Sequence, residues 1–129
     1  VEVIPGITSA IAAAESFGIP LTIKNRISSV AILTGRKKDI KAKIDAPDCG
    51  TLIYLMAVAN IANVVKALRR SKRSEDTPCA FIERATSKDS RIICATIRTI
   101  EREAQKFRIK PPAVLIVGEV VRRGRRTKT

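Results

Sequence analysis

Cationic side chains are the chemically active groups that this chain holds in greatest number. The chain has 129 residues, with 25 Lys and Arg against 12 Asp and Glu, which gives a net charge of +13. Fifteen of the 25 cations fall in three eight-residue windows, at residues 36–43, 66–73 and 122–129. Such clusters can be solvated faces, or they can bind an anionic substrate or a nucleic acid.

The residue types that most often carry out catalysis are absent or unsuitably spaced. The chain has no His, which excludes His-activated nucleophiles, a His general base and His-ligated zinc. Its cysteines form no Cys-x-x-Cys pair, so we expect reduced, packed thiols and no metal cofactor. No Gly-rich phosphate-binding loop occurs. The sequence therefore predicts that this chain does not contain a complete set of catalytic residues.

Aromatic side chains bear on the nucleic-acid hypothesis, because bases usually stack on them. The chain has only four: Phe17, Tyr54, Phe81 and Phe107. Each lies in an apolar stretch and is therefore expected in the core. Binding of a nucleic acid is disfavoured on this ground, although a basic RNA-binding module stays as an alternative.

The location of the chain follows from its apolar runs. The longest uncharged run, residues 49–65, is shorter than the ~20 apolar residues of a membrane-spanning helix. No signal peptide opens the chain. We therefore expect a cytoplasmic protein without a membrane partner. The start at Val1, within an apolar run, suggests a fragment, an excised domain or a processed product.

The elements that must position the charged residues alternate between strands and helices. We expect an Ala-rich helix that begins at Thr8 or Ser9 and runs through Phe17, a helix N-capped by Asn60, and a helix over residues 99–107. The expected strands are residues 1–4, 29–33, 51–56, 78–83, 91–97 and 113–117. Only seven residues separate two of these strands, between Glu83 and Arg91, which favours a hairpin. The pattern predicts an α/β domain with a mixed sheet flanked by helices.

Five stretches, in this order and spacing, give the chain a resemblance to a known family. They are residues 1–10 (VEVIPGITSA), 18–22 (GIPLT), 54–60 (YLMAVAN), 76–86 with its Glu-Arg-Ala-Thr end, and 111–121 (PPAVLIVGEVV). Each stretch is weak evidence alone, but the five in register resemble the C-terminal half of the uroporphyrinogen-III C-methyltransferases, within the tetrapyrrole methylase superfamily. The resemblance covers residues 1–121 and leaves residues 122–129 as a basic, frayed tail.

The resemblance implies a function and a set of partners. Such enzymes use S-adenosylmethionine to methylate uroporphyrinogen III twice, which gives precorrin-2 for sirohaem and cobalamin synthesis. They have two α/β domains with the cofactor between them, and we expect a homodimer. The Gly-rich loop and the Gly-Asp-Pro motif belong to an N-terminal domain that this chain lacks, so the isolated chain is expected to be inactive. A sister methyltransferase that acts on another corrin precursor is an alternative.

Site residues are carried over from the family motifs. They imply that Thr8, Ser9, Met56, Ala85 and Ala113 bind the cofactor, where small residues allow a nucleoside to approach the backbone. No catalytic residue is predicted.

The substrate side of the site is expected at a cationic turn. The substrate carries eight carboxylates, and Arg36 and Lys37 follow a strand end, where clefts in α/β sheets open. We therefore expect Arg36 and Lys37 to bind the substrate, although the family usually has His in place of Arg36.

Overall fold

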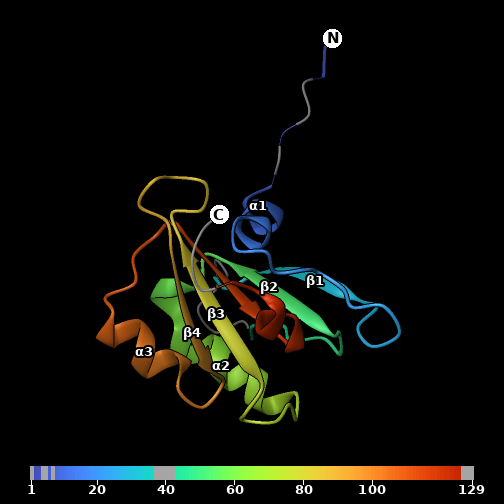
Figure 1. Ribbon diagram of the computed structural model, residues 1–129. Coiled ribbons are helices and arrows are strands. Elements are labelled where there is room, and N and C mark those ends of the chain that lie inside the picture. The colour runs from blue at the N-terminus through green and yellow to red at the C-terminus, as the bar shows by residue number, and fades with distance from the viewer. Residues whose placement is uncertain (1, 4–5, 7, 37–42, 126–129) are drawn as a thin grey trace.

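A mixed five-stranded sheet forms the centre of the computed structural model, which describes residues 2–3, 6, 8–36 and 43–125 (Figure 1). The strands are β1 (Val30–Thr34), β2 (Thr51–Leu55), β3 (Pro78–Glu83), β4 (Arg91–Thr96) and β5 (Ala113–Val117). Their order in the sheet is β1-β2-β5-β3-β4. The predicted α/β class and mixed sheet are confirmed.

Strand direction and burial follow the sequence pattern. β1 and β2 are parallel, whereas β5 runs antiparallel to both β2 and β3, and β3 pairs with β4 as a hairpin. Every residue of β3 and β5 is buried, as expected for apolar runs that are covered on both faces. β4 lies at one edge of the sheet and is only half-buried.

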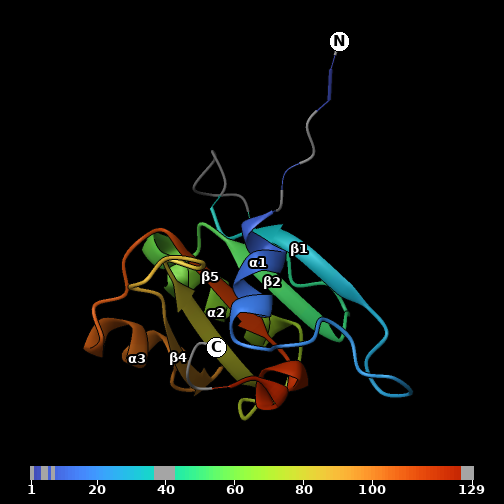
Figure 2. The same ribbon diagram turned by 45° about the horizontal axis from the view of Figure 1, so that its top comes forward.

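Helices cover both faces of the sheet. They are α1 (Ser9–Ser16), α2 (Ile61–Arg70) and α3 (Ile100–Lys106), with two short 3-10 helices, η1 (Val58–Asn60) and η2 (Glu119–Arg123). The two views place α1 on the face opposite α2 (Figures 1 and 2). On the α1 face, Phe17 and Val120 pack with Ile53 and Ile116. On the other face, Leu68 and Ile100 belong to a core cluster with Tyr54 and Leu115.

The first helix begins as its sequence predicts, while the second begins differently. Thr8 caps α1, and its hydroxyl accepts a hydrogen bond from Ala10 N at 3.4 Å. Asn60 precedes α2 but makes no capping hydrogen bond. Its amide instead donates to the carbonyl of Gly35 at 2.9 Å, so the prediction of a side-chain cap at Asn60 is wrong.

The two ends of the chain differ from their predicted structure. Glu2 and Val3 belong to no strand, which contradicts the predicted strand at residues 1–4 where the structure describes it. Arg122 and Arg123 complete η2, and Arg125 N donates to Phe17 O at 2.6 Å, so the segment after residue 121 starts as ordered backbone rather than a frayed tail. Residues 126–129 lie outside the described part.

Candidate functional site

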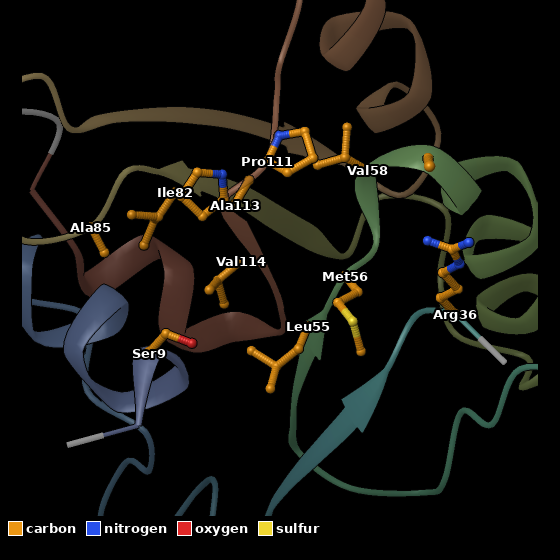
Figure 3. A pocket seen from close by; sticks show the side chains of 12 residues that line it. Ser9, Arg36, Leu55, Met56, Val58, Ile82, Ala85, Pro111, Ala113 and Val114 are labelled. Carbon is orange, nitrogen blue, oxygen red and sulfur yellow. The ribbon is translucent and has the colours of Figure 1, made fainter. Parts of the chain in front are cut away.

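A pocket of about 540 Å³ opens at the end of the sheet where several strands terminate (Figure 3). The carboxyl ends of β1, β2 and β3 meet there with the amino end of β5, because β5 runs antiparallel to β2 and β3. The first residue of α1, Ser9, completes the lining. The edge at which parallel strands end is the usual place for a ligand in an open α/β sheet.

Five of the seven sequence-predicted residues come together in this pocket. Ser9, Arg36, Met56, Ala85 and Ala113 all line it, although they come from five separate segments. Arg36 is the only charged residue in the part of the lining that the structure describes.

Of the remaining two predicted residues, the structure describes only Thr8. Thr8 caps α1 beside Ser9 but does not line the pocket. Lys37 lies outside the described residues.

Several further lining residues are apolar and are not among the sequence-predicted site residues. They all lie within the family stretches at residues 54–60, 76–86 and 111–121, and membership of these stretches is the one signal that could have identified them. They include Leu55, Val58, Ala59, Ile82, Pro111 and Val114.

The backbone is strained where two of the strands end. Met56, directly after β2, has φ 57°, and Arg84 and Thr86, on either side of Ala85, have φ 52° and 69°. Residues other than Gly rarely adopt positive φ, and such strain concentrates at functional sites. Each of these turns ends a strand abruptly and brings a predicted cofactor residue to the pocket.

The turn that carries Arg36 is held close to β2. Gly35 N donates to Leu55 O at 2.7 Å, and a Cβ atom on Gly35 would lie only 2.7 Å from the Cα atom of Ala57. Only Gly permits this approach without a shift of the backbone.

A buried carboxylate connects two walls of the pocket. Glu83, at the end of β3, is 7 % exposed and accepts hydrogen bonds from Arg91 Nε at 2.7 Å and from Lys110 N at 2.8 Å. Arg84 N also donates to Pro112 O at 2.9 Å. The segment that leads to Ala85 and the segment that leads to Ala113 are therefore fixed to each other.

The ionisation of Glu83 reflects these contacts. Burial would raise the pKa of the Glu83 carboxyl, but the hydrogen bonds from Arg91 and Lys110 and the charges of Arg91 and Arg84 lower this pKa below its ordinary value. Glu83 is thus an anion at neutral pH, which holds its two donors in place. Neither Glu83 nor Arg91 is among the sequence-predicted residues of the site.

The described residues provide no metal cluster. No three His, Cys, Asp or Glu side chains in this part of the chain gather as a metal ion would require. No helix in the same part combines the length and apolar character needed to cross a membrane.

Comparison with known proteins gives consistent relatives. The family model for Tetrapyrrole (Corrin/Porphyrin) Methylases matches residues 1–101. A uroporphyrinogen-III C-methyltransferase from Methanocaldococcus jannaschii is 42% identical over 125 residues, which cover 93% of this chain and 52% of that protein. The enzyme of the same name from Bacillus subtilis is 35% identical over 125 residues, with 93% and 49% covered.

The solved structures agree with the sequence relatives. A uroporphyrin-III C-methyltransferase from Thermus thermophilus in complex with S-adenosylhomocysteine superposes with a TM-score of 0.74 at 32% identity, and the match covers 94% of this chain and 51% of that one. The chain thus spans about half the length of the relatives named here. With a family model that matches most of its residues, the chain belongs to the tetrapyrrole methylase family.

Proposed function

We propose that this chain is the C-terminal half of an S-adenosylmethionine-dependent methyltransferase that converts uroporphyrinogen III to precorrin-2, on the way to sirohaem and cobalamin. One observation carries the proposal: Ser9, Met56, Ala85 and Ala113, which the family motifs assign to the cofactor, line a single pocket. The names of the relatives and the S-adenosylhomocysteine in one of them support the same activity.

The residues present fit the proposed cofactor. Ala113 is buried, Ala85 is half-buried and Pro111 adds a further apolar surface, so a purine or a ribose can lie close to the backbone there. The pocket volume of about 540 Å³ also lies within the usual range for small-molecule sites. Thr8 contributes indirectly, because it caps the helix on which Ser9 stands.

The proposed methyl transfer requires mainly that the protein orient the two reactants. S-adenosylmethionine, when bound, would supply a methyl group on a positively charged sulfur, which a nucleophilic pyrrole carbon can accept as the carbon–sulfur bond breaks and S-adenosylhomocysteine leaves as a neutral thioether. The task of the protein residues is to hold the two reactants together and to exclude water, which is a large part of many enzymatic accelerations. Arg36, and with it Lys37, would attract the carboxylates of the tetrapyrrole.

The proposal includes the parts of the protein that this chain does not supply. The Gly-rich loop and the Gly-Asp-Pro motif would come from an N-terminal domain that closes the other side of the cofactor. The complete enzyme would act as a cytoplasmic homodimer. This chain supplies one wall of the site, so the isolated 129 residues are expected to show no turnover.

A chimera tests the proposed function. In it, this chain replaces the matching segment of the Methanocaldococcus jannaschii relative, which supplies the missing half. With S-adenosylmethionine and uroporphyrinogen III, we expect a product that is heavier by two methyl groups, while the isolated chain gives none. A folded chimera that binds S-adenosylhomocysteine but methylates only another corrin precursor would favour the sister enzyme. No methylation of any tetrapyrrole would contradict the proposal.

A further inference from the structure

The two ends of the pocket differ in chemistry. Figure 3 shows Ala85 and Arg36 on opposite sides, with Met56 between them. The end near Ala85 and Ala113 is apolar apart from the Ser9 hydroxyl, whereas Arg36 brings a guanidinium group, the only charge in the described lining. A guanidinium group matches the geometry of a carboxylate and can bind it through two hydrogen bonds.

Both backbone polar groups of Gly35 are used to hold the turn before Arg36. Its N–H donates to Leu55 O at 2.7 Å, and its carbonyl accepts from Asn60 Nδ2 at 2.9 Å. The Thr34 hydroxyl closes the same turn, since it donates to Arg36 O at 2.8 Å and accepts from Arg36 N at 3.2 Å. The backbone on both sides of Gly35 is therefore fixed.

The orientation of the Asn60 amide is itself set by a neighbour. Its Oδ1 accepts from Asn63 Nδ2 at 2.6 Å, which leaves Nδ2 to face the Gly35 carbonyl. Gly35 cannot retreat toward Ala57, because the two residues already lie closer than a Cβ atom would allow. Asn60 thus contacts the turn before Arg36 at Gly35 and does not itself line the pocket.

We propose that Asn60 is a positioning residue for substrate recognition. Its hydrogen bond to Gly35 holds the turn of residues 34–36 so that Arg36 receives a carboxylate of the tetrapyrrole at the cationic end of the pocket. This inference rests on the proposed function, because it takes the substrate class from it. It adds a role for Asn60 that neither the family motifs nor helix capping assigns.

Binding measurements on the chimera described above test this role without turnover. The probe is uroporphyrin III, a stable and fluorescent tetrapyrrole with the same carboxylates, titrated in the presence of S-adenosylhomocysteine. Arg36→Ala should weaken its binding about tenfold, as expected for one lost charge-assisted contact. Asn60→Ala should weaken it about fivefold. The control Gln105→Ala removes an exposed amide on α3 that does not line the pocket, and it should change binding less than about twofold.

The double variant gives the decisive readout. If Asn60 acts through Arg36, then Asn60→Ala causes no further loss in a chain that already carries Arg36→Ala. Gly35→Ala, which moves the same turn from its other side, should behave in the same way and serves if Asn60→Ala does not fold. Additive losses in a folded protein would overturn the proposal.

A second pair of ligands tests whether the carboxylate that Arg36 binds belongs to the tetrapyrrole or to the cofactor. S-adenosylhomocysteine carries a carboxylate, whereas methylthioadenosine does not. If Arg36→Ala weakens only S-adenosylhomocysteine, the carboxylate belongs to the cofactor and the inference is overturned. Porphyrin binding that shows the expected coupling in a chimera without methylation would instead contradict the proposed activity and support the role of Asn60.

Discussion

The Glu83 carboxylate lies 2.7 Å from Arg91 Nε, directly across the hairpin of β3 and β4. Arg91 Nη2 also donates to Phe107 O, while Glu83 accepts from Lys110 N. The ion pair thus joins the end of β3 and the start of β4 to the segment that enters β5. This segment leads into Pro111 and Ala113, which line the pocket. The ion pair therefore helps to hold this wall of the pocket in place.

Loss of the Glu83 charge should destabilise the fold. We expect Glu83→Gln to lower the free energy of unfolding by about 1.5–3 kcal/mol at pH 7, the usual loss for hydrogen bonds to a buried charged group. Urea unfolding followed by circular dichroism measures it. The matched control is Glu75→Gln, since Glu75 also lies 2.7 Å from an arginine, Arg69, but at the surface. There we expect a loss under about 1 kcal/mol. Equal losses would contradict the role of Glu83.

Acid should remove the contribution of Glu83 in a defined direction. Its folded pKa lies below the ordinary value, so the stabilisation is complete above the unfolded pKa of about 4.3 and is lost as the pH falls through the folded pKa. The stability curves of the wild type and of Glu83→Gln should therefore converge below about pH 4. Curves that stay parallel down to low pH would show that the charge of Glu83 is not what stabilises the fold.

Alkali should act on Tyr54. This side chain is fully buried, and its hydroxyl donates to Asp45 O at 2.6 Å. Burial raises the pKa of Tyr54 to about 12, with a lowering effect of Arg73 and a further raising effect of Asp45. The unfolded phenol ionises first, near pH 10, so stability should fall by about 2–3 kcal/mol as the pH rises from 10 to 12.

A Tyr54→Phe variant isolates this effect. It should lose about 1 kcal/mol at pH 7 from the missing hydrogen bond, and its stability should fall less steeply than that of the wild type above pH 10. Cys79 contributes to the slope of both proteins, because burial raises the pKa of its thiol to about 12. The difference between the two curves therefore reports Tyr54. Identical slopes would contradict the prediction.

Two of the central strands can be predicted because their apolar runs are uninterrupted. Residues 79–82 and 113–117 contain no polar side chain, and they lie in the buried strands β3 and β5. Prediction from the local sequence fails for Asn60. Its local position suits a helix cap, but the carbonyl that it binds lies 25 residues earlier in the chain. Local propensity cannot reveal a competing hydrogen-bond acceptor that only the tertiary fold brings near the side chain.

The residues of the site can be predicted more readily than the way it is built. The family motifs name Ala85 and Ala113, yet their proximity depends on the insertion of β5 between β2 and β3, which no local pattern predicts. The pairing of Glu83 with Arg91 is implicit in the predicted hairpin, since the two residues flank its connection and lie opposite each other. The further bond from Lys110 N to Glu83 spans 27 residues, so the hairpin alone does not reveal it.

The rival RNA-binding function predicts a different response to salt and charge. We expect the chain to bind mixed RNA no more tightly than about 10⁻⁶ M at ~0.15 M salt, the level of non-specific binding. Filter binding measures it. The truncation to compare is the removal of residues 126–129, because Arg125 N is bonded to Phe17 and should be kept. Submicromolar binding that loses about one unit of salt slope per removed cation would favour the rival.

The wall of the pocket should respond to added volume at Ala85. This residue stands between two residues of positive φ and is half-buried at the apolar end of the pocket. In the chimera, Ala85→Phe would fill space that the nucleoside needs, so affinity for S-adenosylhomocysteine should fall more than about tenfold, or ~1.4 kcal/mol. Calorimetric titration measures it. Met56→Leu is the matched control, since Met56 is 62% exposed and its expected contact is through the backbone. The affinity of this variant for S-adenosylhomocysteine should change less than about twofold, because the two side chains have similar volumes.

Two outcomes would contradict these assignments. Unchanged affinity in a folded Ala85→Phe protein would remove Ala85 from the cofactor site. A large loss with Met56→Leu would show that the Met56 side chain, not its backbone, makes the contact.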